Sequence, residues 1–174
     1  MPVSTSWRPW LTACTIVLAT GAAGTLWAQD QRPKLRLTSA ELDSLPRIGA
    51  SQGTSGVAGI ETSVVTGAPA KPGLYTILLR VPAHTEIAAH THPDDRVATV
   101  LSGTWYFGYG TRFDRQALKA LPPGSIYAEP PGVAHFARTG DSAVVVQITG
   151  VGPTGTRYLD PHADPTRESS DTSH

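Results

Sequence analysis

Between residues 60 and 149, short runs of β-branched and aromatic residues alternate with glycine and proline. Of the features of this sequence, this alternation most limits the folds that the chain can adopt. Such runs favour strands, and the glycines and prolines between them favour turns. We expect strands at 60–65, 73–81, 97–101, 104–109, 125–129, 135–138 and 143–149. Within 73–81, Tyr75, Ile77 and Leu79 share one face, as burial of one side of a strand requires. The pattern predicts an all-β sandwich or closed barrel.

Two short helices are expected beside these strands. Thr38 and Glu41 have the spacing of a capping box, which predicts a helix from about residue 39 to 45. Asp114 can cap a second helix over residues 115–120.

The N-terminus resembles an export signal. An apolar run over residues 10–27 ends at the small residue Ala28 and is followed by polar residues. This pattern is typical of a signal peptide, residues 1–28, cleaved after Ala28, which would place the protein in the periplasm or outside the cell with no stable membrane anchor. An uncleaved anchor is the alternative, since about 20 apolar residues span a bilayer. The single cysteine, Cys14, lies within this leader.

The rest of the chain is divided by composition. Residues 29–58 form an extension with a short helix, residues 59–160 the barrel domain, and residues 161–174 a polar tail that we expect to be disordered. Lysine plus arginine and aspartate plus glutamate number 14 each and form no block of one sign. This balance argues against nucleic acid as a partner.

Three histidines suggest chemistry. His90 and His92 are separated by one residue, and on a strand this spacing points both imidazoles to the same face, where they can bind a transition metal together. His135, on a later strand, can supply a third nitrogen if the sheet closes. Spacing alone leaves open an exposed His-X-His pair and a structural His135.

The residues around these histidines resemble the two cupin motifs. Residues 90–103 contain a His-X-His pair and a glycine that ends the strand. Residues 124–135 match the second motif at four positions, Gly124, Pro130, Gly132 and His135. The resemblance covers about residues 70–150. It implies a cupin β-barrel (a double-stranded β-helix or jelly roll) with a divalent metal, Fe, Mn, Ni, Cu or Zn, on His90, His92 and His135.

One position departs from the first motif, because Arg96 stands where cupins usually have a glutamate that binds the metal. An arginine cannot coordinate a metal. Three outcomes are open: a site of three histidines alone, a carboxylate or amide from elsewhere, or no metal. Substitute ligands would be Asp94, Asp95, Glu129 or Gln147. Arg96 could grip a carboxylate or enolate ligand, or be a surface charge paired with Asp94 or Asp95 in a solvated loop.

The resemblance leaves two function classes open. The first is a metal-dependent dioxygenase or related oxidoreductase acting on a small acidic or enolisable molecule, in which Glu129, Tyr127 and Arg96 orient the substrate or move protons. Some cupin dioxygenases that cleave β-diketones have an all-histidine iron centre and a glutamate six residues before the third histidine, where Glu129 stands here. The second is a non-catalytic protein that binds or senses a small molecule, with or without metal. Such barrels also form homodimers, although no residue here indicates one.

Overall fold

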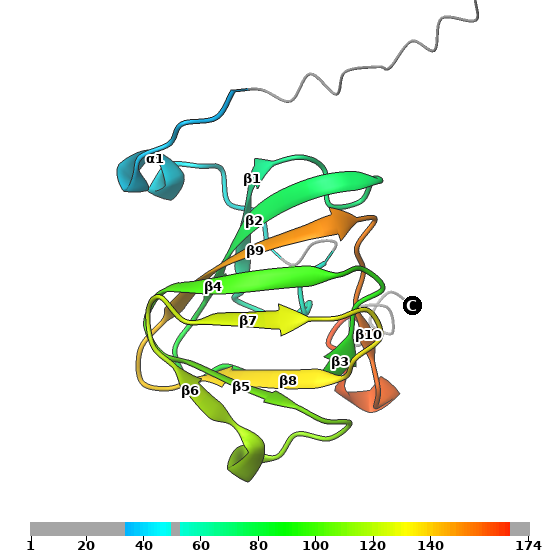
Figure 1. The fold of residues 1–174 in the computed structure, drawn as a ribbon. Coiled ribbons are helices and arrows are strands. Elements are labelled where there is room, and N and C mark those ends of the chain that lie inside the picture. The colour runs from blue at the N-terminus through cyan, green and yellow to red at the C-terminus, as the bar shows by residue number, and fades with distance from the viewer. Residues whose placement is uncertain (1–33, 50–52, 168–174) are drawn as a thin grey trace, which may run out of the picture. The chain divides into compact units, whose positions relative to one another are not determined.

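The computed structural model describes residues 34–49 and 53–167, and its framework is two antiparallel five-stranded sheets (Figure 1). The first sheet has the strand order β1–β2–β9–β4–β7. Its strands, in that order, are Glu61–Thr66, Gly73–Val81, Val144–Gly152, Arg96–Ser102 and Ile126–Glu129.

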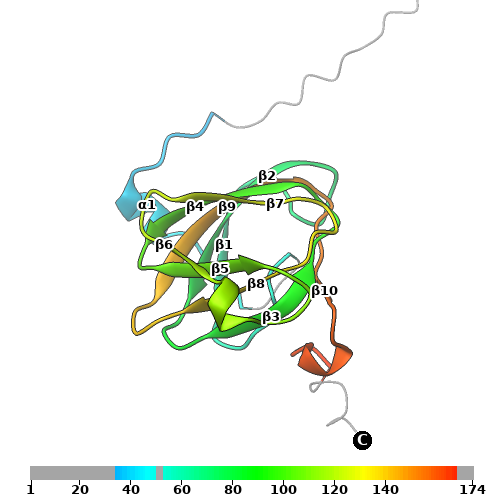
Figure 2. The same ribbon diagram turned by 60° about the horizontal axis from the view of Figure 1, so that its bottom comes forward.

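The second sheet has the strand order β10–β3–β8–β5–β6. Its strands, in that order, are Arg157–Tyr158, Glu86–Thr91, His135–Thr139, Trp105–Tyr109 and Lys119–Leu121. The two sheets face each other across a shared interior, as the turned view shows (Figure 2). The expected all-β barrel is confirmed.

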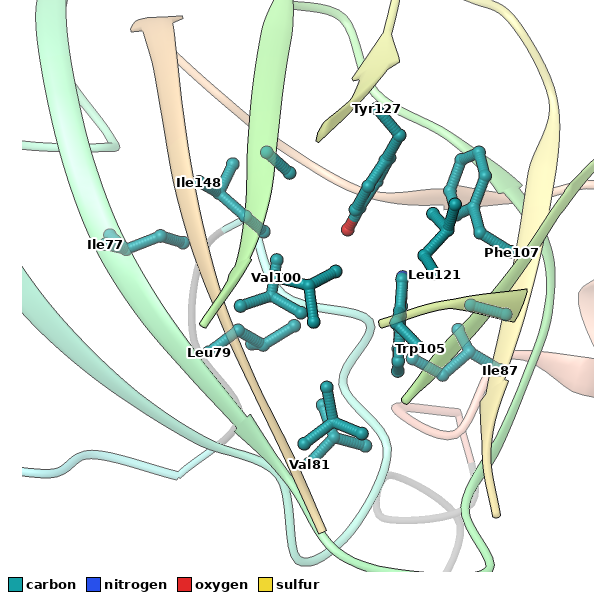
Figure 3. Packing of buried hydrophobic residues seen from close by; sticks show 14 of the residues in the cluster. Ile77, Leu79, Val81, Ile87, Val100, Trp105, Phe107, Leu121, Tyr127 and Ile148 are labelled. Carbon is teal, nitrogen blue, oxygen red and sulfur yellow. The ribbon is translucent and has the colours of Figure 1, made fainter. Parts of the chain in front are cut away.

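The interior is filled by the inward faces of both sheets. In β2 the inward face has the predicted period of two, with Tyr75, Ile77 and Leu79 in the core cluster. Leu78, on the other face, is buried as well. Side chains of the two sheets meet in one hydrophobic cluster (Figure 3). Burying each large apolar side chain contributes about 1.5–3 kcal/mol, so this cluster is the main source of stability.

Helical structure is slight. Helix α1, Ser39–Asp43, begins at Thr38, and its capping box with Glu41 is formed as predicted. The predicted helix over 115–120 is wrong in extent: Asp114 caps a 3-10 helix, Arg115–Ala117, and the chain then enters β6. The ladder that β6 forms with β5 determines the structure there, because tertiary pairing overrides local propensity.

The predicted terminal segments lie wholly or partly outside the described residues. The predicted signal peptide, residues 1–28, lies outside the described residues. The expected disordered tail begins with a 3-10 helix, Pro161–Ala163, capped by Asp160. Within residues 34–49 and 53–167, no helix is long and apolar enough to span a membrane.

Candidate metal centre

The three histidines come from one sheet. His90 lies near the end of β3, His92 directly after that strand, and His135 begins β8. His90 and His135 are register partners across the β3–β8 ladder, and their ring centroids lie 4.4 Å apart. All three side chains are buried, with at most 5% of any residue exposed. The sheet therefore brings together the residues that the motifs predicted.

Backbone carbonyls fix the orientation of all three imidazoles. Nδ1 lies 2.8 Å from the Ala88 oxygen in His90, 2.5 Å from the Gly155 oxygen in His92, and 3.1 Å from the Val133 oxygen in His135. A carbonyl only accepts, so each Nδ1 carries the proton and donates it, which leaves the Nε2 lone pair free.

The free nitrogens converge as a metal site requires. The ligand atoms of the three histidines all lie within 4.8 Å of one another. Nε2 of His92 and of His135 is buried without a hydrogen-bond partner, and a buried polar atom left in that state is costly. Ligand atoms around a bound first-row ion lie about 3.0–3.4 Å apart, so the three side chains would move closer together on binding the ion. These residues fit a transition metal ion, which would satisfy the unpaired nitrogens.

Electrostatics keep the imidazoles neutral. Burial is the largest influence and lowers the pKa of His90 to about 4, with His135 adding to the effect. Burial and the charge of Arg96 lower the pKa of His92 to about 2, and burial also lowers the pKa of His135. The three imidazoles are thus uncharged at neutral pH, with Nε2 unprotonated, which is the state that binds metal.

These lowered pKa values predict an acid-sensitive metal-free protein. An unfolded histidine has a pKa of about 6.5, so between pH 6.5 and 4 the unfolded chain binds more protons than the native one. The free energy of unfolding should fall by up to about 1.4 kcal/mol per pH unit for each buried histidine as the pH drops below 6.5. Urea denaturation at pH 7 and pH 5 measures this change. His90→Gln should reduce the pH dependence of the free energy of unfolding. His162→Gln, at an exposed position, is the control and should leave that dependence unchanged. An equal free energy of unfolding of the wild type at both pH values would contradict the prediction.

Arg96 and Glu129 form a buried ion pair beside the histidines. They are register partners on β4 and β7, and neither residue is more than 4% exposed. Arg96 Nε donates to Glu129 Oε2 at 2.6 Å, Nη2 donates to the same oxygen, and Nη1 donates to the Gly53 oxygen at 2.8 Å. The expectation of a surface arginine paired with Asp94 or Asp95 is wrong, because position 96 shares the inward face of β4 with Ala98 and Val100.

The other candidate ligands point elsewhere. Asp94 is buried rather than solvated, and its carboxylate accepts hydrogen bonds from Tyr75 at 2.7 Å and Thr154 at 2.6 Å. Asp95 is exposed, and Gln147 lies on the face of β9 opposite to the buried Val146. Glu129, by contrast, reaches the histidines: its carboxylate oxygens lie 3.7 Å from Nε2 of His92 and 3.7 Å from Nε2 of His135.

The histidines line a small cavity inside the barrel. Its free space is about 20 Å³, enough for a single ion or water molecule. Tyr127 lines it with its ring packed on Phe107, which in turn stacks on His135. Burial raises the pKa of Tyr127 well above its usual value, so its phenol remains protonated.

One side of the cavity was not foreseen from the sequence. The segment from Gly53 to Ser55 also lines it, and Tyr158 donates a hydrogen bond to the Ser55 carbonyl. The Ser55 hydroxyl is buried without a hydrogen-bond partner. These residues belong to the extension over residues 29–58, for which the sequence predicted only a short helix.

Comparison with known proteins identifies the architecture. No family model matches the chain, and no curated protein matches it. Among solved structures it resembles one described as a sugar phosphate isomerase from a cupin superfamily, from Silicibacter pomeroyi, at 20% identity and a TM-score of 0.53, over 72% of this chain and 81% of the other. It also resembles an uncharacterized protein with a double-stranded β-helix domain from Klebsiella pneumoniae, at 22% identity and a TM-score of 0.51, over 73% of this chain and 99% of the other. Likenesses at this level of identity show the fold alone.

Proposed function

We propose that this chain, which has the cupin fold, is a metal-dependent oxidoreductase of the dioxygenase type that acts on a small acidic or enolisable molecule. In this proposal Nε2 of His90, His92 and His135 binds one divalent transition metal ion. The observation that carries the proposal is the contact of each Nδ1 with a backbone carbonyl, in three histidines whose ligand atoms lie within 4.8 Å of one another. A structural histidine does not need a buried, unpaired Nε2.

The side chains around this point suit hydrogen bonding to a bound acid or enol. A redox-active ion held there would supply Lewis acidity and electron transfer. Burial tends to raise the pKa of Glu129, but the charge of Arg96, with His135 and His92, lowers it to about 2. Glu129 is therefore ionised and a weak base, which suits it to accept a hydrogen bond from a bound acid or enol. Tyr127, a protonated phenol, can donate a hydrogen bond to an anionic ligand.

The size of the cavity limits what can bind. A space of about 20 Å³ does not hold an organic molecule, so a substrate must displace some of the lining side chains. This restriction favours small ligands. It also supports a second candidate, a non-catalytic protein that captures metal or a small anion. The leader at residues 1–28 would place either activity in the periplasm or outside the cell.

Metal content and oxygen uptake test the proposal. Protein purified without chelator should carry about one transition metal ion per chain. Iron-loaded protein should consume oxygen with at least one member of a panel of β-diketones and small phenolic acids. Oxygen uptake that stays flat across the panel, with tight binding of one acid, would favour the binding protein. Metal content near zero after reconstitution with each ion would exclude both metal-dependent functions.

A further inference from the structure

The ion pair of Arg96 and Glu129 occupies the side of the site where a fourth protein ligand would be expected. Glu129 Oε2 receives two N–H groups of the same guanidinium, and the third bond of that guanidinium, to the Gly53 carbonyl, fixes its position. Charge-assisted hydrogen bonds of this kind are about twice as strong as neutral ones. The carboxylate is therefore held on the arginine side of the cavity.

The carboxylate lies beside the free nitrogens, so its hydrogen bonds to Arg96, rather than its distance, decide whether it can join them. Neighbouring ligand atoms on an ion with bonds of about 2.1 Å lie about 3.0–3.4 Å apart. The carboxylate oxygens of Glu129 lie 3.7 Å from the nearest free nitrogens. The set of ligand atoms that lie within 4.8 Å of one another contains the three histidines and not Glu129.

We infer that Arg96 keeps Glu129 off the metal, so that an ion on the three histidines takes an external anion where cupins usually supply a carboxylate. The inference rests on the proposed metal binding. It makes Arg96 a positioning residue: its bonds to Oε2 decide whether Glu129 acts as a nearby hydrogen-bond acceptor or as a ligand. Arg96 itself touches neither the metal nor the anion in this scheme.

The charges of the side chains around the cavity also favour an anion as the additional ligand of the metal. Arg96 and Glu129 neutralise each other, and the imidazoles are neutral. Among the described residues that line the cavity, no other side chain is charged. A bound divalent ion would retain its full charge inside a water-poor interior, where charge interactions are strong. The site should therefore select a small anion with an oxygen or nitrogen donor, of the carboxylate or enolate class.

Cobalt(II) and azide provide the test, because cobalt(II) has visible absorption bands that report its ligands and azide is a small anion. Cobalt-loaded wild-type protein should bind azide with a change in these bands. In Arg96→Met, Glu129 is released and should coordinate, so the spectrum should differ before azide is added and azide affinity should fall at least about tenfold. Arg96→Met combined with Glu129→Gln should restore the wild-type spectrum and azide affinity. Arg115→Met, which removes an arginine from the exposed pair with Glu86, is the matched control and should behave as wild type.

The outcomes separate the inference from the function on which it rests. Failure of the wild type to bind cobalt would overturn the proposed metal function and the inference with it. Cobalt binding with the same spectrum and azide affinity in Arg96→Met would overturn the inference alone. If Arg96→Met does not fold, the cobalt spectrum of Glu129→Gln decides. The inference expects the wild-type bands, with a weaker affinity because Arg96 is left unpaired beside the ion. Altered bands in Glu129→Gln would show that Glu129 is a ligand and would overturn the inference.

Discussion

Replacing His135 by alanine should remove metal binding almost completely, from about one ion per chain to nearly none. His135 supplies one of three convergent nitrogens, and a site left with two imidazoles and no protein carboxylate in contact binds a divalent ion weakly. His90→Ala should have the same effect, because the two residues are register partners that face the same point. Elemental analysis after dialysis, and competition with a chromogenic chelator, measure the loss.

A matched histidine separates this effect from a general one. His162 lies in the exposed 3-10 helix Pro161–Ala163, away from the three-histidine set, so His162→Ala should keep full metal content. Circular dichroism should show that His135→Ala retains the β spectrum of the barrel. Full metal content in folded His135→Ala would mean that the ion is not held by these histidines.

Replacing Glu129 by alanine should lower the free energy of unfolding of the metal-free protein by about 3–5 kcal/mol, because Arg96 would be left charged and unpaired in the interior. Only 2% of Arg96 is exposed, so water cannot replace the lost carboxylate. The Gly53 carbonyl still accepts one hydrogen bond, but a neutral acceptor does not cancel the charge. Urea denaturation at pH 7 measures the change.

The exposed pair of Arg115 and Glu86 is the internal control, with 65% and 45% of the two side chains accessible. Glu86→Ala should cost less than about 1 kcal/mol, because solvent screens an exposed ion pair. Arg96→Met combined with Glu129→Leu should recover much of the stability lost in Glu129→Ala, since an apolar pair leaves no buried charge. Equal losses for Glu129→Ala and Glu86→Ala would contradict the view that the inner pair is desolvated.

The fold and the histidines were predictable because their signals are local. Period-two burial in β2, the capping box at Thr38 and the spacing of the second motif each involve residues within a short stretch. The orientation of Arg96 was also accessible, since it shares the alternation of Ala98 and Val100. The predicted strand began at residue 97, which left Arg96 in the preceding loop, whereas β4 begins at Arg96.

The rest of the site depends on register between distant segments. That Glu129 is the partner of Arg96 follows from the β4–β7 ladder, which no local pattern specifies. The burial of Asp94 likewise depends on Tyr75 and Thr154, 19 and 60 residues away in sequence. Strands β3 and β10 were missed because each is short or poor in β-branched residues, and pairing with neighbours defines them.

The histidines and the ion pair belong to different sheets. His90 and His135 lie in the sheet of β3 and β8, and His92 continues from β3, whereas Arg96 and Glu129 lie in the sheet of β4 and β7. Small movements of one sheet against the other would thus leave the spacing among the three nitrogens intact while changing their distance from the carboxylate. Motion between the sheets would therefore set how closely Glu129 can approach an ion that the histidines hold.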